Sequence, residues 1–182
     1  MNAASELLGE RSADDVAMED VARRAGASRA LLYRYFPTKQ NLLRAVASHE
    51  ITALHTAIQG QDLRTGLGTF VDRVRSRSYG FRLLHEGGLN RDPAVRAMLD
   101  ESKLHLGEIL LELLGLTETT PRTELAVHGW MDLAIAVCLH WSRSPEVSRD
   151  EVVDLLEVAA LSLLSPPAQP ADEPADDTAG TP

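Results

Sequence analysis

The chain has 182 residues, 44% of them apolar and 25% charged, which is typical of a globular protein, and its formal net charge of −9 argues against general affinity for polyanions. Its single cysteine excludes an internal disulfide, and it has no uncharged apolar run of roughly 18 residues and no basic start followed by an apolar leader. We therefore expect a soluble cytoplasmic protein with no membrane partner.

Apolar residues recur at helical spacing along the chain, and alternating strand patterns are close to absent, so the sequence predicts an all-α fold. Short helices are expected first, at Ala3 to about Glu10, Met18 to Ala25 and Arg29 to Tyr35. The Gly-Ala-Ser break at residues 26–28 is short enough to turn sharply between the second and third helices. Pro37 ends the third helix because the residue before a proline is disfavoured in the α region.

Longer helices are expected in the rest of the chain. In order, they are a helix capped by Thr38 and running towards Ile58, a helix from Thr69 to Leu84, a helix from Asp92-Pro93 to Gly115, and two helices at about Pro121 to Ser142 and Ser148 to Leu164. Gly60, Gly66 and Gly68 predict a loosened junction after the first of these. Asp92 is a favourable N-cap, and proline is favoured at the first helical position that follows it.

The last two helices are apolar over most of their circumference, whereas a surface helix shows a single apolar stripe. One protomer covers only one side of such a pair, so we expect a second copy of the chain to cover the other side. A fully internal helix pair in a monomer is the alternative. The expected dimer contacts are Val127, Met131, Ala134, Cys138, Trp141, Val152, Leu156, Ala159 and Leu163. Among these, Cys138 is also expected to be a small core residue rather than a reactive thiol.

Residues 21–49 carry six basic side chains and no carboxylate, although the chain as a whole is acidic. Tyr33, Tyr35 and Phe36 are interleaved with these charges. A basic segment with aromatic residues predicts contact with nucleic acid, whereas a solvated basic face would require neither the turn nor the tyrosines.

A helix, a three-residue break and a short helix together predict a helix-turn-helix, whose second helix enters the major groove with its first residues at the base edges. Arg29 is able to fork onto a guanine, and Ala30 is small enough to touch a thymine methyl. The expected contacts are Ser28, Arg29 and Ala30 towards the bases, and Tyr33, Arg34, Tyr35 and Lys39 towards the phosphates.

The segment MEDVARRAGASRALLYRYFPTKQNLLRAV resembles the N-terminal signature of the TetR (tetracycline-repressor) family of transcriptional regulators, in its Ala-Gly-x-Ser turn, its Leu-Tyr-x-Tyr-Phe recognition helix and the lysine that follows. The resemblance covers residues 3 to about 47. It implies a helix-turn-helix DNA-binding domain at 1–47 and a helical effector-binding and dimerisation domain at 48–164. The acidic, proline-rich composition of 165–182 predicts a disordered tail.

The resemblance further implies a homodimeric repressor that binds a pseudo-palindromic operator in double-stranded DNA and is released by a small-molecule effector. Large or polar residues on otherwise apolar faces are the candidates for the effector pocket, and core packing is the alternative reading of the apolar ones. The candidates are Phe70, Arg77, Phe81, Met98, His105 and Trp130. No nucleophile motif, phosphate-binding glycine loop or metal-ligand spacing of histidines appears, so we expect no enzyme activity, no metal and no cofactor.

Two departures from the family pattern favour a second hypothesis, a helical protein-interaction module that has lost DNA binding. Ala17 stands where the family usually places a Ser or Thr cap, so the second helix lacks a cap unless Asp14 or Asp15 supplies one. The sequence also starts at Met1 without the basic segment that often precedes the first helix.

Overall fold

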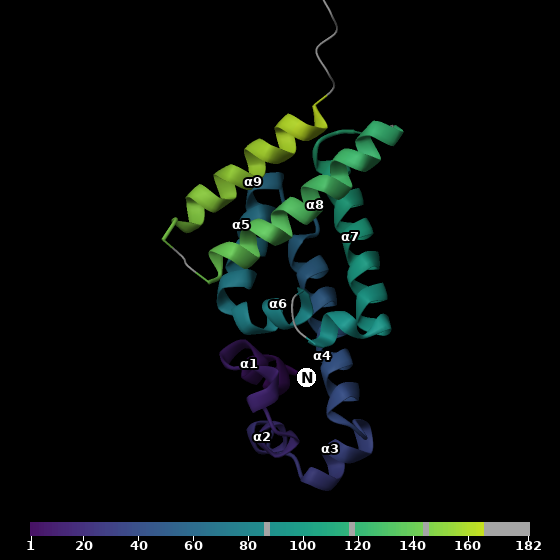
Figure 1. The fold of residues 1–182 in the computed structure, drawn as a ribbon, viewed down its shortest axis with the longest axis vertical. Helices are drawn as coiled ribbons and strands as arrows, with labels where there is room; N and C mark the ends of the chain where they lie inside the picture. Colours follow the sequence, from purple (N-terminus) through teal and green to yellow (C-terminus); the bar gives the residue numbers. More distant parts are fainter. Residues whose placement is uncertain (86–87, 117–118, 144–145, 166–182) are drawn as a thin grey trace, which may run out of the picture.

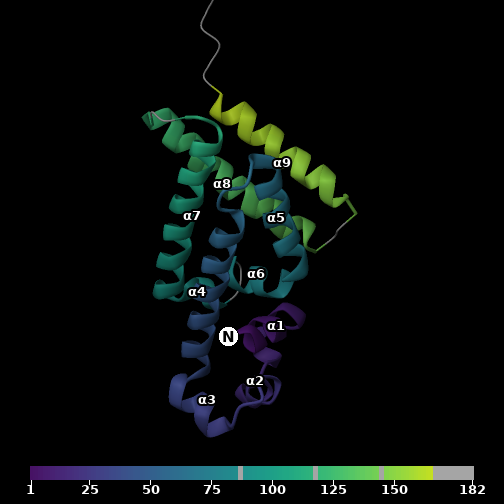
Figure 2. The same ribbon diagram turned by 180° about the vertical axis from the view of Figure 1, so that it is seen from behind.

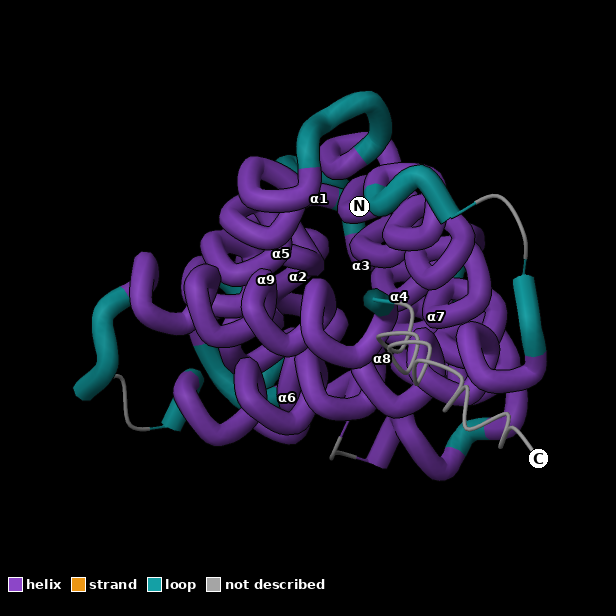
Figure 3. Tube along the Cα trace, turned by 90° about the horizontal axis from the view of Figure 1, so that it is seen from above, coloured by secondary structure: helices purple, strands orange, loops and turns teal. Residues whose placement is uncertain are grey.

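The computed structural model describes residues 1–85, 88–116, 119–143 and 146–165. In these ranges every regular element is helical, which confirms the all-α prediction, and only helix and loop are seen from above (Figure 3). The elements are α1 (Asn2–Glu10), α2 (Met18–Arg24), α3 (Arg29–Tyr35), α4 (Lys39–Ile58), α5 (Leu63–Ser76), α6 (Ser78–His85), α7 (Pro93–Leu113), α8 (Pro121–Trp141) and α9 (Arg149–Leu164), with short 3-10 helices η1 (Ala13–Asp15) and η2 (Gly88–Arg91). The predicted disordered tail after Ser165 lies outside the described residues.

The helices form a small group and a larger group along the long axis of the molecule (Figure 1). α1, α2 and α3 make up the small group at one end, and α4 runs from it into the larger group formed with α5 to α9, as the view from behind also shows (Figure 2). Each group has its own apolar core, and α7 contributes to both. None of the helices in the described ranges combines the length and the apolar character that a membrane crossing requires.

Local signals fix the starts of α3, α4 and α7. Ser28, Thr38 and Asp92 each use a side-chain oxygen to accept a backbone N–H of the first turn, at 3.2, 3.1 and 3.0 Å. Such caps satisfy amides that have no partner within the helix. The predicted starts of these three helices are therefore confirmed.

The region between α4 and α7 differs from the predicted single helix of Thr69 to Leu84. α5 begins earlier, at Leu63, and the chain breaks at Arg77 before α6. Gly66 and Gly68, which predicted a loosened junction, lie inside α5 and are buried. The prediction for this region was wrong because these glycines serve packing rather than a break in the helix.

Close packing against α4 and α9 explains the two glycines. A Cβ on Gly68 would lie 2.5 Å from Nη2 of Arg149, and a Cβ on Gly66 would lie 3.3 Å from Cγ2 of Ile58. Arg149 is held there by two hydrogen bonds to the Asp72 carboxylate, at 3.0 and 2.9 Å. The glycines therefore let α4 and α9 approach α5 more closely than a larger residue would.

The apolar faces of α8 and α9 that were expected to meet a second copy are mostly covered by the same chain. Trp130 Nε1 donates a hydrogen bond to the carbonyl of Leu156 at 3.0 Å, which joins the two helices within the protomer. The buried members of the predicted interface are Val127, Met131, Ala134, Cys138, Trp141, Val152 and Leu156. These residues belong to the core of one protomer, so their prediction as interface residues is corrected. Ala159 is half-buried against the same core, and only Leu163 is exposed.

Cys138 lies at the centre of this core and has no exposed surface. Burial raises the pKa of its thiol to about 12, because the apolar surroundings disfavour the thiolate. The prediction of a core cysteine rather than a reactive one is therefore confirmed.

Asp92 joins the first two turns of α4 to the start of α7. Its Oδ2 accepts hydrogen bonds from Arg44 Nε at 2.7 Å and Gln40 Nε2 at 2.6 Å, while Oδ1 caps α7. These donors, Arg44 first, stabilise the ionised carboxylate and lower its pKa from 3.8 to about 2. The charge of Asp92 thus stabilises the contact between α4 and α7.

We expect Asp92→Asn to lower the free energy of unfolding at neutral pH and to lower it much less near pH 2. The pKa of this carboxyl is lower in the folded chain than in the unfolded one, so its contribution is present above the ordinary value of 3.8 and is lost as pH falls towards about 2. Urea denaturation of both proteins from neutral pH downwards measures this. A difference between them that does not change with pH would show that the charge plays no such part.

Candidate nucleic-acid interface and ligand cavity

The turn between α2 and α3 depends on Gly26. Its φ of +63° lies in the left-handed region, which glycine adopts without steric cost. The Ala27 N–H bonds to the Ala22 carbonyl at 2.9 Å and the Gly26 N–H to the Arg23 carbonyl at 3.2 Å, which is the Schellman pattern of a helix C-terminus. The chain leaves α2 in a tight turn and begins α3 directly after Ser28, as a helix-turn-helix requires.

The structure places all the residues predicted to contact DNA on α3, its cap and the first residue of α4. Leu32 faces inward and is 8% exposed, whereas Tyr33 and Tyr35 are 41% and 65% exposed. The set brought together is Ser28, Arg29, Ala30, Tyr33, Arg34, Tyr35 and Lys39. We call this set the recognition surface. It lies at the end of the molecule farthest from α9 (Figure 1), where no other helix covers it.

Acidic residues from outside residues 21–49 neutralise most of the basic charge inside that segment. The ion pairs are Arg23 with Asp20, Arg24 with Glu10 and Glu6, Arg29 with Glu19, and Arg44 with Asp92. Among the described residues, only Arg34 and Lys39 of this segment form no ion pair. The charge count over residues 21–49 missed this pairing because the carboxylates come from α1, from the start of α2 and from the residue that caps α7.

The two remaining charges have different surroundings. The Arg34 guanidinium lies over the Tyr35 ring, 5.3 Å from its centroid, in a cation–π arrangement. Lys39 Nζ donates to the backbone carbonyl of Asp14 at 3.5 Å, which joins the start of α4 to η1. Both charges stay available to an anion, because neither is matched by a carboxylate.

Glu19 is the residue of this surface that the sequence analysis missed. Its Oε1 lies 2.5 Å from Arg29 Nη2, and both side chains are exposed. The carboxylate comes from the first turn of α2 and occupies the guanidinium that was expected to read a base. Arg29 must therefore exchange this partner for DNA, or carry Glu19 to the groove with it.

The start of α2 also differs from expectation. Ala17 provides no side-chain cap, and neither Asp14 nor Asp15 replaces it, since both belong to η1. Instead, Asp20 Oδ2 accepts the Ala17 N–H at 3.3 Å, and this bond is the largest cause of a lowered pKa at Asp20. One half of a capping box is thus present. The missing cap no longer argues for a module that has lost DNA binding.

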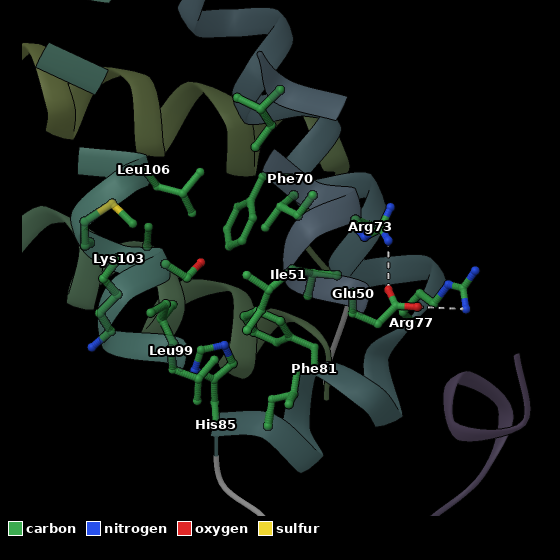
Figure 4. Close-up of a pocket in the computed structure, with 18 of the residues that line it drawn as sticks. Glu50, Ile51, Phe70, Arg73, Arg77, Phe81, His85, Leu99, Lys103 and Leu106 are labelled. Atoms are coloured by element: carbon green, nitrogen blue, oxygen red, sulfur yellow. Dashed lines mark hydrogen bonds and ion pairs between the residues drawn. The ribbon is translucent and has the colours of Figure 1, made fainter. Parts of the chain in front are cut away.

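A cavity of about 160 Å³ lies within the larger group, between α4, α5, α6, α7 and α8, and reaches α1 (Figure 4). Its lining is mostly apolar. Of the predicted pocket residues, Phe70, Arg77, Phe81 and Trp130 line it, and the rings of Phe70 and Phe81 meet edge to face at 5.9 Å. By volume the cavity would hold roughly ten or more water molecules, which is room for a small ligand.

Met98 and His105 do not line this cavity, so their prediction as pocket residues is corrected. His105 lies on the exposed side of α7, with Nδ1 3.6 Å from Glu108 and its ring 4.7 Å from that of His55. Its place within an apolar pattern suggested an inward position, but α7 turns it towards solvent. No group of three or more potential metal ligands occurs within the described ranges.

The polar lining of the cavity gathers around Glu50, which the sequence analysis did not identify. Its carboxylate binds Arg73 Nη2 at 2.8 Å and lies 3.4 Å from Arg77 Nη1 (Figure 4). Lys103 also lines the cavity and is paired with Asp132 at 2.6 Å. No sequence motif marks Glu50, because its partners come from α5 and the break that follows it.

The sequence matches known families over both helical groups. Residues 1–46 match "Bacterial regulatory proteins, tetR family", and residues 59–172 match "Tetracyclin repressor-like, C-terminal domain".

Individual relatives agree with these matches. A tetR-family transcriptional regulator of known structure from Streptomyces coelicolor is 29% identical, has a TM-score of 0.81 and matches over 89% of this chain and 77% of its own. The HTH-type transcriptional activator FasR from Mycolicibacterium smegmatis is 23% identical over 164 residues, which are 84% of this chain and 75% of FasR. Thermus thermophilus FadR, a transcriptional repressor solved with lauroyl-CoA, is 21% identical with a TM-score of 0.62 over 94% of this chain and 96% of its own, and it shares the fold.

We expect Glu19→Gln to strengthen binding to duplex DNA about two- to fivefold. The substitution removes a competing partner of Arg29 and a negative charge beside the DNA backbone, and an exposed ion pair is worth roughly 0.2–1 kcal/mol. Fluorescence anisotropy with labelled duplex measures the change.

The matched control for this variant is Glu157→Gln. Glu157 pairs with Arg64 at the same 2.5 Å but lies on α9, far from the recognition surface, so DNA affinity should not change. Weaker binding by Glu19→Gln would mean that Glu19 orients Arg29 for the base rather than competing for it.

Proposed function

Because the chain belongs to the tetR family of bacterial regulatory proteins, and is therefore a DNA-binding transcriptional regulator, we propose that it acts as a homodimer whose hold on operator DNA is controlled by a small apolar ligand in the cavity. The family is one of regulators and not of enzymes. The exposed recognition surface on α3 is the observation that carries this proposal.

The residues of the recognition surface have the chemistry that a major groove requires. Arg29 offers a bidentate donor for guanine, and Ala30 leaves room for a thymine methyl. Tyr33, Tyr35 and Lys39 offer hydroxyls and an ammonium to the phosphates, which position the helix without reading sequence. Since α3 reaches only a few base pairs, two copies one helical turn apart, roughly 34 Å, would read a pseudo-palindromic operator.

We propose that the second copy docks on the outer faces of α8 and α9. These faces carry the apolar side chains of Leu125, Leu133, Leu155, Val158 and Leu161, each between 37% and 75% exposed, whereas the inner faces fill the core. A Cβ on Gly129 would meet nothing within 4 Å, so a partner helix could approach there. α8 and α9 from two copies would form a four-helix pack.

An acyl compound is the ligand class that the cavity fits best. Aromatic and aliphatic side chains dominate its wall, as in most small-molecule sites. The structural relative FadR was solved with lauroyl-CoA, a long apolar chain on a polar carrier. We propose that the chain of such a compound lies between Phe70, Phe81 and Trp130.

A regulator that releases DNA when it binds its ligand can act either as a repressor or as an activator. A ligand that prefers one conformer shifts the protein towards it by the difference in its affinity for the two conformers. The relatives include FadR, named a repressor, and FasR, named an activator. We propose that the position of the operator relative to the promoter sets the sign of regulation.

Selection of genomic fragments on the purified protein identifies the operator and tests the proposed function. On that operator, Arg29→Ala should relax the preference at one base position, at a loss of about 1–3 kcal/mol on the cognate site and much less on random duplex. Lys39→Ala should weaken binding to the cognate site and to random duplex alike. It should also reduce the salt dependence of DNA binding by about one released counterion. Equal losses on cognate and random DNA for Arg29→Ala would contradict its role in reading sequence.

Leu155→Asp should convert the proposed dimer into a monomer at micromolar concentration. A carboxylate at the centre of an apolar helix pack has no partner there, and loss of the second recognition helix should reduce operator affinity more than tenfold. Light scattering after gel filtration measures the mass. Leu104→Asp, at an equally exposed leucine on α7, is the control and should leave the dimer intact. A wild-type protein that is monomeric at micromolar concentration would contradict the proposed dimer.

A further inference from the structure

The side of the cavity that faces α1 differs chemically from the rest of its wall. Ser5 of α1, Glu50 of α4, and Arg73 and Arg77 line this side. In Figure 4 the cluster of Glu50, Arg73 and Arg77 lies beside the apolar middle formed by Ile51, Phe70 and Phe81. We call Ser5, Glu50, Arg73 and Arg77 the polar end of the cavity.

Two buried polar atoms of the polar end have no hydrogen-bond partner in the described part of the chain. They are the Ser5 hydroxyl oxygen, in a residue that is 3% exposed, and Nη1 of Arg77. Nη1 is attracted to Glu50 at 3.4 Å, but no acceptor completes a hydrogen bond to it. Unpaired buried polar groups are rare and unfavourable, so two at one cavity indicate a missing acceptor.

Packing brings the Arg77 side chain close to α1, the helix that carries Ser5. A Cβ on Gly9 would lie 3.5 Å from Cδ of Arg77, so the Arg77 side chain crosses α1 at Gly9. Ser5 precedes Gly9 by four residues and therefore lies on the same face of α1, one turn away. Ser5 and the Arg77 side chain therefore line the same end of the cavity.

The charge of the polar end favours an anion. Two guanidiniums share the single carboxylate of Glu50, which leaves one positive charge at the cavity wall without a carboxylate partner among the residues that the structure describes. A carboxylate accepts hydrogen bonds through both oxygens and forms strong, charge-assisted bonds with arginine.

We infer that the cavity binds an apolar molecule that ends in a carboxylate, with the carboxylate held between Arg77 Nη1 and the Ser5 hydroxyl. The inference rests on the proposed function of the cavity as the effector site and adds the polar group of the ligand. Ser5 belongs to the helical group that carries the recognition surface, so the ligand touches that group directly. A ligand of this kind joins α1 to the Arg77 break, whereas an uncharged ligand fills the cavity without doing so.

Titration of the full chain with decanoate, decan-1-ol and decanoyl-CoA tests the inference. The signal is the tryptophan fluorescence of the protein, to which Trp130 in the cavity wall and Trp141 outside it both contribute. Decanoate should bind wild type at least tenfold more tightly than decan-1-ol. Arg77→Met, which keeps an unbranched apolar stem but removes the guanidinium, should abolish that preference without changing the affinity for decan-1-ol. Ser5→Ala should weaken decanoate binding roughly tenfold.

Arg75→Met is the matched control, because Arg75 lies outside the cavity and pairs with Asp72 on the surface of α5. It should keep the full preference for decanoate. Unchanged binding of decan-1-ol by each variant shows that the fold is intact.

Equal affinity of wild type for decanoate and decan-1-ol would overturn the inference, and so would the absence of binding by both. Tighter binding of decanoyl-CoA that Arg77→Met leaves unchanged would also overturn it, since the polar group would then lie elsewhere. These outcomes are separate from failure of the proposed function, because operator selection is done without ligand.

Discussion

The structure depends on one continuous helix, α4, that belongs to both helical groups. Its first half supplies Leu42 and Val46 to the core beneath the recognition surface, and its second half lines the ligand cavity with Leu54 and Ile58. Glu50 lies between these halves and binds Arg73. Because a helix of 20 residues cannot change its length or register freely, a shift of its cavity half must move the other half as well.

Signals carried by adjacent residues were sufficient to predict the helix-turn-helix. Caps at Ser28 and Thr38, the break at Gly26 and the stop at Pro37 act within one turn of the chain, so they can be read from the sequence alone.

Features that depend on distant contacts could not be predicted in this way. Gly68 suggested a break, but it accommodates Arg149, which is far away in sequence, and Glu19 lay outside the basic segment whose charge it reduces. The near-complete apolarity of α8 and α9 predicted that both sides are covered but did not show which residues face inward. Leu156 turned out to be core, and Leu155 beside it turned out to be exposed.

The contact between α1 and α6 limits how freely the two halves of this protein can be recombined with those of its relatives. The carbonyl oxygen of Leu8 lies 3.7 Å from the position that a Cβ on Gly80 would take. Likewise, Cδ of Arg77 lies 3.5 Å from the position that a Cβ on Gly9 would take. A Cβ fits at both places, but in a chimera that joins this helix-turn-helix to the larger helical group of a relative, side chains larger than alanine there would disturb both contacts. The helix-turn-helix and the larger helical group of this protein are therefore expected to evolve together rather than as interchangeable modules.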